Sequence, residues 1–89
     1  MKWKEGVKVT KKKKDGYLLR MNQKEKMILP EHNYLLLAIQ NGMQDDKELV
    51  EHIIKQEKIC EAAAGFTLAG FIIEYADYIA EDRSHYEII

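Results

Sequence analysis

The chain of 89 residues contains one cysteine, one proline and one tryptophan, and it has no long run of apolar residues. A single cysteine, Cys60, cannot form a disulfide within the chain or supply a metal-binding pair, so we expect it to act as a small apolar residue in a helix. No segment reaches the roughly 18 apolar residues of a membrane span, and the first residues lack the apolar core of a signal peptide. We therefore expect a cytoplasmic protein without a membrane segment.

The sequence also lacks the residue patterns that catalysis and cofactor binding need. His32, His52 and His85 have no ligand-like spacing, and we expect each to be a surface or half-buried side chain. Gly65 and Gly70 lie within a helical pattern rather than after a strand, so close helix packing explains them better than a phosphate-binding loop does. Hence we predict no catalytic residue, no metal and no cofactor, and a binding protein rather than an enzyme.

What the chain does contain is a mixture typical of one packed domain, with 46% hydrophobic and 33% charged residues. We expect a single domain over residues 1–89. The net charge of -1 conceals a division, because residues 1–30 hold ten lysines and arginines against three acidic residues, whereas residues 31–89 hold four against twelve. The molecule should therefore be an electrostatic dipole, basic at one end and acidic at the other.

The first third of the chain alternates apolar and polar residues in the manner of strands with one buried face. The apolar positions are Val7 and Val9, then Tyr17, Leu19 and Met21, then Met27 and Leu29. Asp15-Gly16 predicts a two-residue hairpin turn, with the lysines at 11–14 at its lip, and a second reversal is expected near residues 22–25. These signals predict a three-stranded antiparallel sheet within residues 7–29.

The remaining sequence predicts three helices, at about residues 31–41, 46–56 and 59–82, and a tail at 83–89 that we expect to fray. Pro30 suits the first turn of the first helix, and Gly42 suits its end. Asp45 stands three residues before Glu48, which resembles a capping box at the start of the second helix. The fold class is therefore α+β, with an N-terminal sheet followed by three helices.

The third predicted helix has more apolar surface than a small core requires. At 100° per residue its polar positions fall in one narrow stripe, whereas a helix packed on one side needs an apolar stripe of about 100° to 140°. The polar positions are Thr67, Gly70, Glu74, Asp77 and Glu81. One apolar flank holds Ala64, Leu68, Phe71, Tyr75 and Tyr78, and the other holds Ala62, Ala69, Ile73, Ala76 and Ala80. We expect one of these flanks to be a docking surface.

The order of these elements resembles the PqqD-like family, also called the RiPP recognition element, over about residues 7–82. The resemblance rests on Leu29 at the end of a strand, "YLLLAI" at 34–39, Asn41-Gly42 and Glu48-Leu49-Val50. The first helix departs from the family, which usually has Asn, Ser or Thr followed by Pro or Glu at its start. The resemblance implies a winged-helix-like fold that binds the leader of a ribosomally made precursor peptide as a strand added to the third strand, beside the third helix.

Carried onto this chain, the resemblance implies a peptide-binding site with a strand side and a helix side. The strand side comprises Lys24, Glu25, Lys26, Met27, Ile28 and Leu29, and the helix side comprises Leu68, Phe71, Tyr75 and Tyr78. The implied partners are the precursor leader peptide and a separate tailoring enzyme, with a radical S-adenosylmethionine enzyme as the first candidate. Each aromatic residue could equally fill the core, and the strand edge could equally pair with the tail or with a second copy, so a homodimer stays open.

The alternative function is a winged-helix nucleic-acid-binding protein that uses the basic N-terminal hairpin. A recognition helix needs basic and amide side chains on its exposed face, whereas the third helix offers Glu74, Asp77 and Glu81. Only the hairpin would then contact phosphates, without reading bases. We therefore expect the lysines at 11–14 to be a solvated turn that favours acidic partners, and we expect nucleic acid not to be the partner.

Overall fold

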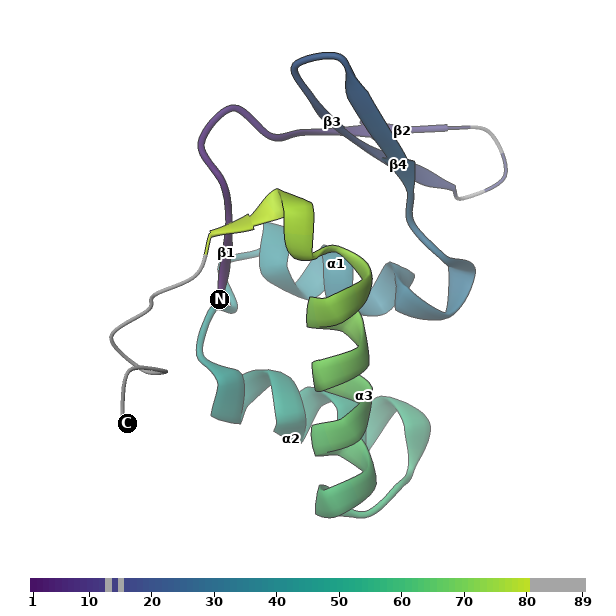
Figure 1. Cartoon of the computed structure of the whole chain (residues 1–89). Coiled ribbons are helices and arrows are strands. Elements are labelled where there is room, and N and C mark those ends of the chain that lie inside the picture. The colour runs from purple at the N-terminus through teal and green to yellow at the C-terminus, as the bar shows by residue number, and fades with distance from the viewer. Residues whose placement is uncertain (13, 15, 81–89) are drawn as a thin grey trace, which may run out of the picture.

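The computed structural model describes residues 1–12, 14 and 16–80. Its fold is α+β: an antiparallel sheet with the strand order β2-β3-β4 lies over three α-helices, and a short ribbon pairs β1 with β5 (Figure 1). The elements are β1 (Lys2–Trp3), β2 (Lys8–Lys11), β3 (Tyr17–Met21), β4 (Lys24–Met27), the 3-10 helix η1 (Pro30–His32), α1 (Asn33–Gln40), α2 (Asp46–Glu57), α3 (Glu61–Glu74), the 3-10 helix η2 (Ala76–Tyr78) and β5 (Ile79–Ala80).

The hairpin between β2 and β3 has a longer reversal than predicted. Lys11 pairs with Tyr17, and the Lys12 N–H donates to the Gly16 carbonyl at 2.7 Å. A two-residue turn at Asp15-Gly16 would have paired residue 14 with Tyr17 and set Lys12 opposite the fully buried Leu19, so that prediction is wrong. The observed register sets Val9 opposite Leu19 instead, and Lys13 and Asp15 lie outside the described residues.

The hairpin between β3 and β4 is tighter than predicted. Asn22 and Gln23 form a two-residue turn, with Asn22 at a φ of +57°, so Met21 pairs with Lys24. This register turns Ile28 into the core at 2% exposure. The alternation predicted Met27 and Leu29 on the buried face, but they are 55% and 38% exposed. Because Met21 pairs with Lys24, every second residue from Lys24 to Ile28 shares the inner face of Met21, and Met27 and Leu29 lie on the other face.

The first two helices form where the sequence predicts them. Gly42 follows α1 with a φ of +102°, a conformation that glycine adopts without strain. Asp45 is the N-cap of α2, and its carboxylate accepts a hydrogen bond from the Lys47 N–H at 3.4 Å. Leu49 and Ile53 are fully buried on the inner face of α2, as the spacing of the apolar residues predicts.

The third helix is shorter than the predicted range of 59–82. The helix α3 ends at Glu74, and the chain then forms η2 and pairs Ile79 with Trp3 in the β1–β5 ribbon. The Lys4 N–H also donates to the Tyr78 carbonyl at 2.9 Å. A continued helix would have lost these bonds and the burial of Ile79, which is 3% exposed. The prediction is therefore wrong beyond Glu74, and the predicted tail lies outside the described residues.

The core lies between the inner face of the sheet and the three helices. The largest fully buried side chains are Leu19, Leu35, Leu36, Leu49, Ile53, Phe71 and Tyr75. In Figure 1 α3 stands upright, with its C-terminal end toward the sheet. This orientation brings the last turn of α3 beside β4. Among the described residues, no helix has the length and the apolar character that crossing a membrane requires.

Candidate functional site

The strand β4 is an edge of the sheet, and within the described residues no strand pairs with its outer side. The Ile28 N–H donates to the Tyr17 carbonyl at 2.9 Å, and Lys26 and Lys24 lie opposite Leu19 and Met21. Hydrogen-bonded pairs alternate along an antiparallel ladder. The backbone N–H and C=O groups of residues 24, 26 and 28 therefore face β3, and those of Glu25 and Met27 face outward.

The predicted strand-side residues divide between the two faces of the sheet. Lys24, Lys26 and Ile28 are on the inner face with Leu19, and of these three Ile28 enters the core. Glu25, Met27 and Leu29 are exposed on the outer face. The edge therefore combines two outward-facing peptide units with the apolar side chains of Met27 and Leu29.

The backbone of Leu29 is held by α3 rather than left open. The Leu29 N–H donates to the Tyr75 hydroxyl at 2.9 Å, and that hydroxyl lies 2.8 Å from His32 Nδ1. A neutral His32 with its proton on Nε2 satisfies both bonds, because the hydroxyl oxygen then accepts from Leu29 while its proton goes to Nδ1. Burial raises the pKa of Tyr75, which keeps the hydroxyl protonated. Tyr75 thus marks one end of the open edge.

An ion pair joins the last turn of α3 to β4. Lys26 Nζ lies 2.6 Å from Glu74 Oε2 and 5.9 Å from the centre of the Tyr75 ring. The hydrogen bond between the two side chains raises the pKa of Lys26 above its ordinary 10.5 and lowers the pKa of Glu74 below its ordinary 4.5. Both groups are therefore charged at neutral pH, and Glu74 balances the positive charge of Lys26 beside the open edge of β4.

The predicted helix-side residues lie in the core. Leu68, Phe71, Tyr75 and Tyr78 are 5%, 0%, 0% and 4% exposed. The Phe71 ring lies 4.8 Å from the Tyr75 ring and 5.4 Å from His32, centre to centre. In this state the four side chains pack the sheet onto α3 and offer almost no surface, and their contact with a peptide stays a prediction.

The exposed apolar surface of α3 lies on its other side. Phe66 and Ile73 are 79% and 76% exposed, and Ala62, Ala69 and Gly70 are exposed between and beside them. The helical projection had already set Ala62, Ala69 and Ile73 apart from the first flank, but it gave Phe66 no role. Which flank is buried could not be read from the helix, because both flanks are apolar.

The glycines of α3 do not have the packing role that the sequence suggested. A Cβ atom added at Gly65 or at Gly70 would meet no atom of the described residues within 4 Å. Close packing within this fold therefore does not explain either glycine. Glycine in a helix interior costs roughly 1 kcal/mol relative to alanine, so both positions need another explanation.

A second candidate site is an open pocket of about 350 Å³ between α1 and α2. Its lining comprises Tyr34, Leu37, Ala38, Asn41, Met43, His52 and Gln56. The Tyr34 hydroxyl donates to a carboxylate oxygen of Glu57, and burial together with this bond raises the pKa of Tyr34. The Tyr34 hydroxyl therefore stays protonated at neutral pH and is no base. No local sequence pattern indicates this pocket, because its lining comes from two helices and the loop between them.

The described residues hold no group of three histidine, cysteine, aspartate or glutamate side chains that could bind a metal. His32 and His52 are half-buried, as expected, and His85 lies outside the described residues. Cys60 is exposed at the N-cap of α3, so the expectation of a small apolar residue within a helix is wrong. It stands one residue before α3, and its side chain is open to solvent.

Comparisons with protein-family models, with curated proteins and with solved structures find no match for this chain.

Proposed function

We propose that this protein is a non-catalytic peptide-binding module that takes up an extended segment as a strand on the outer side of β4. The observation that carries the proposal is the open edge itself, where the peptide units of Glu25 and Met27 face outward beside the apolar side chains of Met27 and Leu29. An exposed strand edge is a template for pairing with another chain. The protein would bind through its backbone and select through its side chains.

The resemblance to the PqqD-like family supplies the identity of the segment. On that reading the fold is a winged-helix variant, with β2, β3 and β4 as the wing and α3 as the third helix. The bound segment is the leader of a ribosomally synthesised precursor peptide, and a separate tailoring enzyme modifies the rest of the precursor. A radical S-adenosylmethionine enzyme is the first candidate for that enzyme.

The length of the open edge limits what backbone pairing contributes. Two outward residues offer two N–H and two C=O groups, and a protein hydrogen bond is worth about 0.5 to 1.5 kcal/mol net. Tyr75 already occupies the next outward N–H, that of Leu29. Apolar contacts of the peptide with Met27 and Leu29 must therefore supply much of the affinity, and alternate apolar side chains in the leader would fit them.

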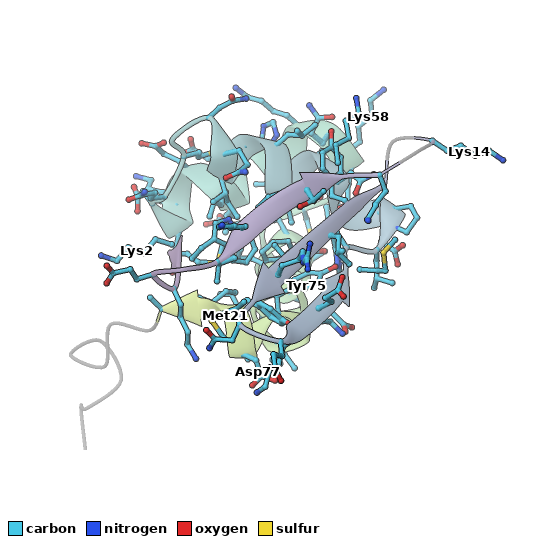
Figure 2. The ribbon with its side chains drawn as sticks, turned by 90° about the horizontal axis from the view of Figure 1, so that it is seen from above. Lys2, Lys14, Met21, Lys58, Tyr75 and Asp77 are labelled. Atoms are coloured by element: carbon cyan, nitrogen blue, oxygen red, sulfur yellow. The ribbon has the colours of Figure 1, made fainter. Side chains whose placement is uncertain are left out.

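The charge around the sheet favours an acidic segment. Lys8, Lys11 and Lys12 are exposed along β2 and just beyond its end, and Figure 2 shows Lys14 projecting from the tip of the β2–β3 hairpin on the far side of the sheet from Asp77. These side chains make no ion pair within the described residues. A leader or enzyme surface with negative charge would meet this end of the sheet.

The same lysines favour a second candidate, a nucleic-acid-binding protein that holds phosphates with the hairpin. Against it, α3 contains no lysine or arginine, and its exposed side is apolar. Such a helix cannot make the bidentate contacts to bases that sequence reading requires. Nucleic acid would therefore be bound through phosphates alone, with an affinity that falls steeply as salt rises.

The test is a titration with the leader of the precursor peptide encoded beside the gene. Met27→Pro removes one outward N–H but no bond to β3, so we expect it to weaken leader binding about tenfold. Met27→Leu keeps the N–H and the apolar bulk, and it should bind within about twofold of the unchanged protein.

No binding of the leader at tens of micromolar would end the peptide proposal. Salt-sensitive binding of an oligonucleotide, lost when Lys11 to Lys14 are replaced by serine, would favour the second candidate. If Met27→Pro and Met27→Leu weaken leader binding equally, the leader does not pair with the backbone of β4.

A further inference from the structure

The exposed stripe of α3 has the spacing of a helix-pairing seam. Ala62, Phe66, Ala69 and Ile73 follow one another at intervals of four, three and four residues, and all four are exposed. This is the alternation of the a and d positions of a coiled coil, over two heptad-like steps. The side chains that face the core, including Phe71, lie on the opposite side of the helix.

We propose that two copies of this chain associate through this stripe, with their α3 helices antiparallel about a two-fold axis. The axis passes between residues 67 and 68, which are midway along the stripe. Phe66 of each copy then packs on Ala69 of the other, and Ile73 packs on Ala62. The contact is isologous, because each copy supplies the same four residues.

The order of large and small residues favours the antiparallel arrangement over a parallel one. A parallel pair would set Phe66 against Phe66 and Ala62 against Ala62, so wide and narrow layers would alternate along the seam. The antiparallel pair puts one large and one small side chain in every layer, which keeps the two helices at a constant separation. The stripe is thus complementary to itself in one direction only.

The two glycines give a second reason for a helix partner. Gly65 and Gly70 lie on either side of the stripe in the helical projection, and neither is required by packing within the described residues. Small residues beside a helix contact let two backbones approach closely. A partner helix packed on the stripe therefore explains two glycines that packing within one copy does not explain.

Charge and area define how strong the association should be. No charged residue lies between Glu61 and Glu74, so the seam desolvates no ion. The helix of 14 residues is only about 21 Å long, and its face falls short of the roughly 800 Å² per partner of a standard interface. We therefore expect a weak, reversible dimer rather than an obligate one.

The experiment is sedimentation equilibrium from about 10 µM to about 1 mM, a range that brackets weak association. The mass of the unchanged protein should rise from 10.4 kDa toward twice that value. Phe66→Asp should remain monomeric at every concentration, and Leu37→Asp, at an exposed leucine on α1, should associate like the unchanged protein. A monomer throughout, or loss of association in Leu37→Asp alone, overturns the proposal.

Two further measurements distinguish association through this stripe from nonspecific association of the exposed apolar surface. Gly70→Leu should fold at least as stably as the unchanged protein, because the space around Gly70 is open and leucine favours a helix more than glycine does, and it should weaken association at least tenfold. A nitroxide on the exposed Cys60 should report a distance between copies of roughly 20 to 30 Å in the antiparallel dimer, against about 10 Å in a parallel one. Unweakened association of Gly70→Leu, or the short distance, contradicts the proposed geometry.

The proposed dimer leaves the outward peptide units of β4 uncovered. Phe66→Asp should therefore bind the leader peptide as well as the unchanged protein does, within about twofold. Loss of leader binding in this variant would show that the stripe belongs to the peptide site, and that result overturns the dimer while sparing the proposed function.

Discussion

The two sides of α3 have similar compositions and opposite surroundings. Leu68 and Phe71 are 5% and 0% exposed, whereas Phe66 and Ile73, on the same helix, are 79% and 76% exposed. Helical amphipathicity normally identifies the core side by contrast with a polar side. Here that contrast is missing, so tertiary contacts rather than the pattern of the helix select the buried side.

The contacts that select it come from the C-terminal end of α3. Tyr75 binds the Leu29 backbone and His32, and Glu74 pairs with Lys26. These polar bonds hold the last turn of α3 against β4 in the orientation that buries Phe71 and exposes Phe66. One apolar side thus stabilises the monomer, and the other is left for a partner.

The largest expected effect comes from comparing the only two phenylalanines of the chain. Phe71→Ala should destabilise the monomer by about 3 to 5 kcal/mol, because it leaves a cavity among Trp3, His32 and Tyr75. Phe66→Ala should change the stability by less than about 0.5 kcal/mol. Urea denaturation at low protein concentration, followed by the fluorescence of Trp3, measures both. Similar losses in the two variants would contradict the division of α3 into a core side and a free side.

A smaller effect should follow from removing the hydroxyl that orients α3. Tyr75→Phe leaves the Leu29 N–H and His32 Nδ1 without their partner, at a cost of about 1 to 3 kcal/mol. Tyr17→Phe is the control, since the Tyr17 hydroxyl makes no side-chain hydrogen bond within the described residues. Thermal denaturation at pH 7 should give a lower melting temperature for Tyr75→Phe than for Tyr17→Phe. Equal melting temperatures would show that the Tyr75 hydroxyl does not stabilise the packing of α3 against β4.

The smallest effect is expected at the ion pair between Lys26 and Glu74, whose side chains are 36% and 38% exposed. The pKa of Glu74 is lowered in the folded state, so its contribution is present above its ordinary pKa of 4.5 and is lost as pH falls through the lowered value. The pKa of Lys26 is raised, so its contribution is present below 10.5 and is lost as pH rises through the raised value.

Glu74→Gln should therefore lower the urea midpoint slightly and by a constant amount between those two limits. The difference from the unchanged protein should shrink on acidification below the lowered pKa of Glu74, and also in high salt, which screens exposed charges. A difference that grew on acidification would show that the pair does not stabilise the fold.

The sequence predicted the local elements and missed the contacts between distant residues. The helical turn that leads into α1, the end of α1 and the start of α2 follow from Pro30, Gly42 and Asp45, whose conformational and capping preferences act within a few residues. The pairing of Trp3 with Ile79 joins opposite ends of the described chain, and no local sequence pattern predicts it. The end of α3 was missed for the same reason, because this pairing competes with a helix that the apolar spacing alone would extend.

The candidate site was predicted in part. The edge strand was found from alternation, but its buried face was wrong: Met21 pairs with Lys24, so Ile28 rather than Met27 shares the inner face. The helix side was assigned to the flank that contains Phe71 and Tyr75, which the structure buries. The bonds that Tyr75 and Glu74 make when this flank meets the sheet join residues far apart in the sequence, so no pattern within the helix predicts them.

Backbone amide hydrogen exchange, measured with and without the leader peptide, tests whether the outer edge of β4 takes up a strand. We expect slower exchange at Glu25 and Met27 and little change at Lys24 and Lys26, whose N–H groups already face β3. This alternation is the signature of an added strand. Leader binding that leaves the Glu25 and Met27 amides unchanged, or that instead protects the hairpin around Lys11 and Lys12, would contradict it.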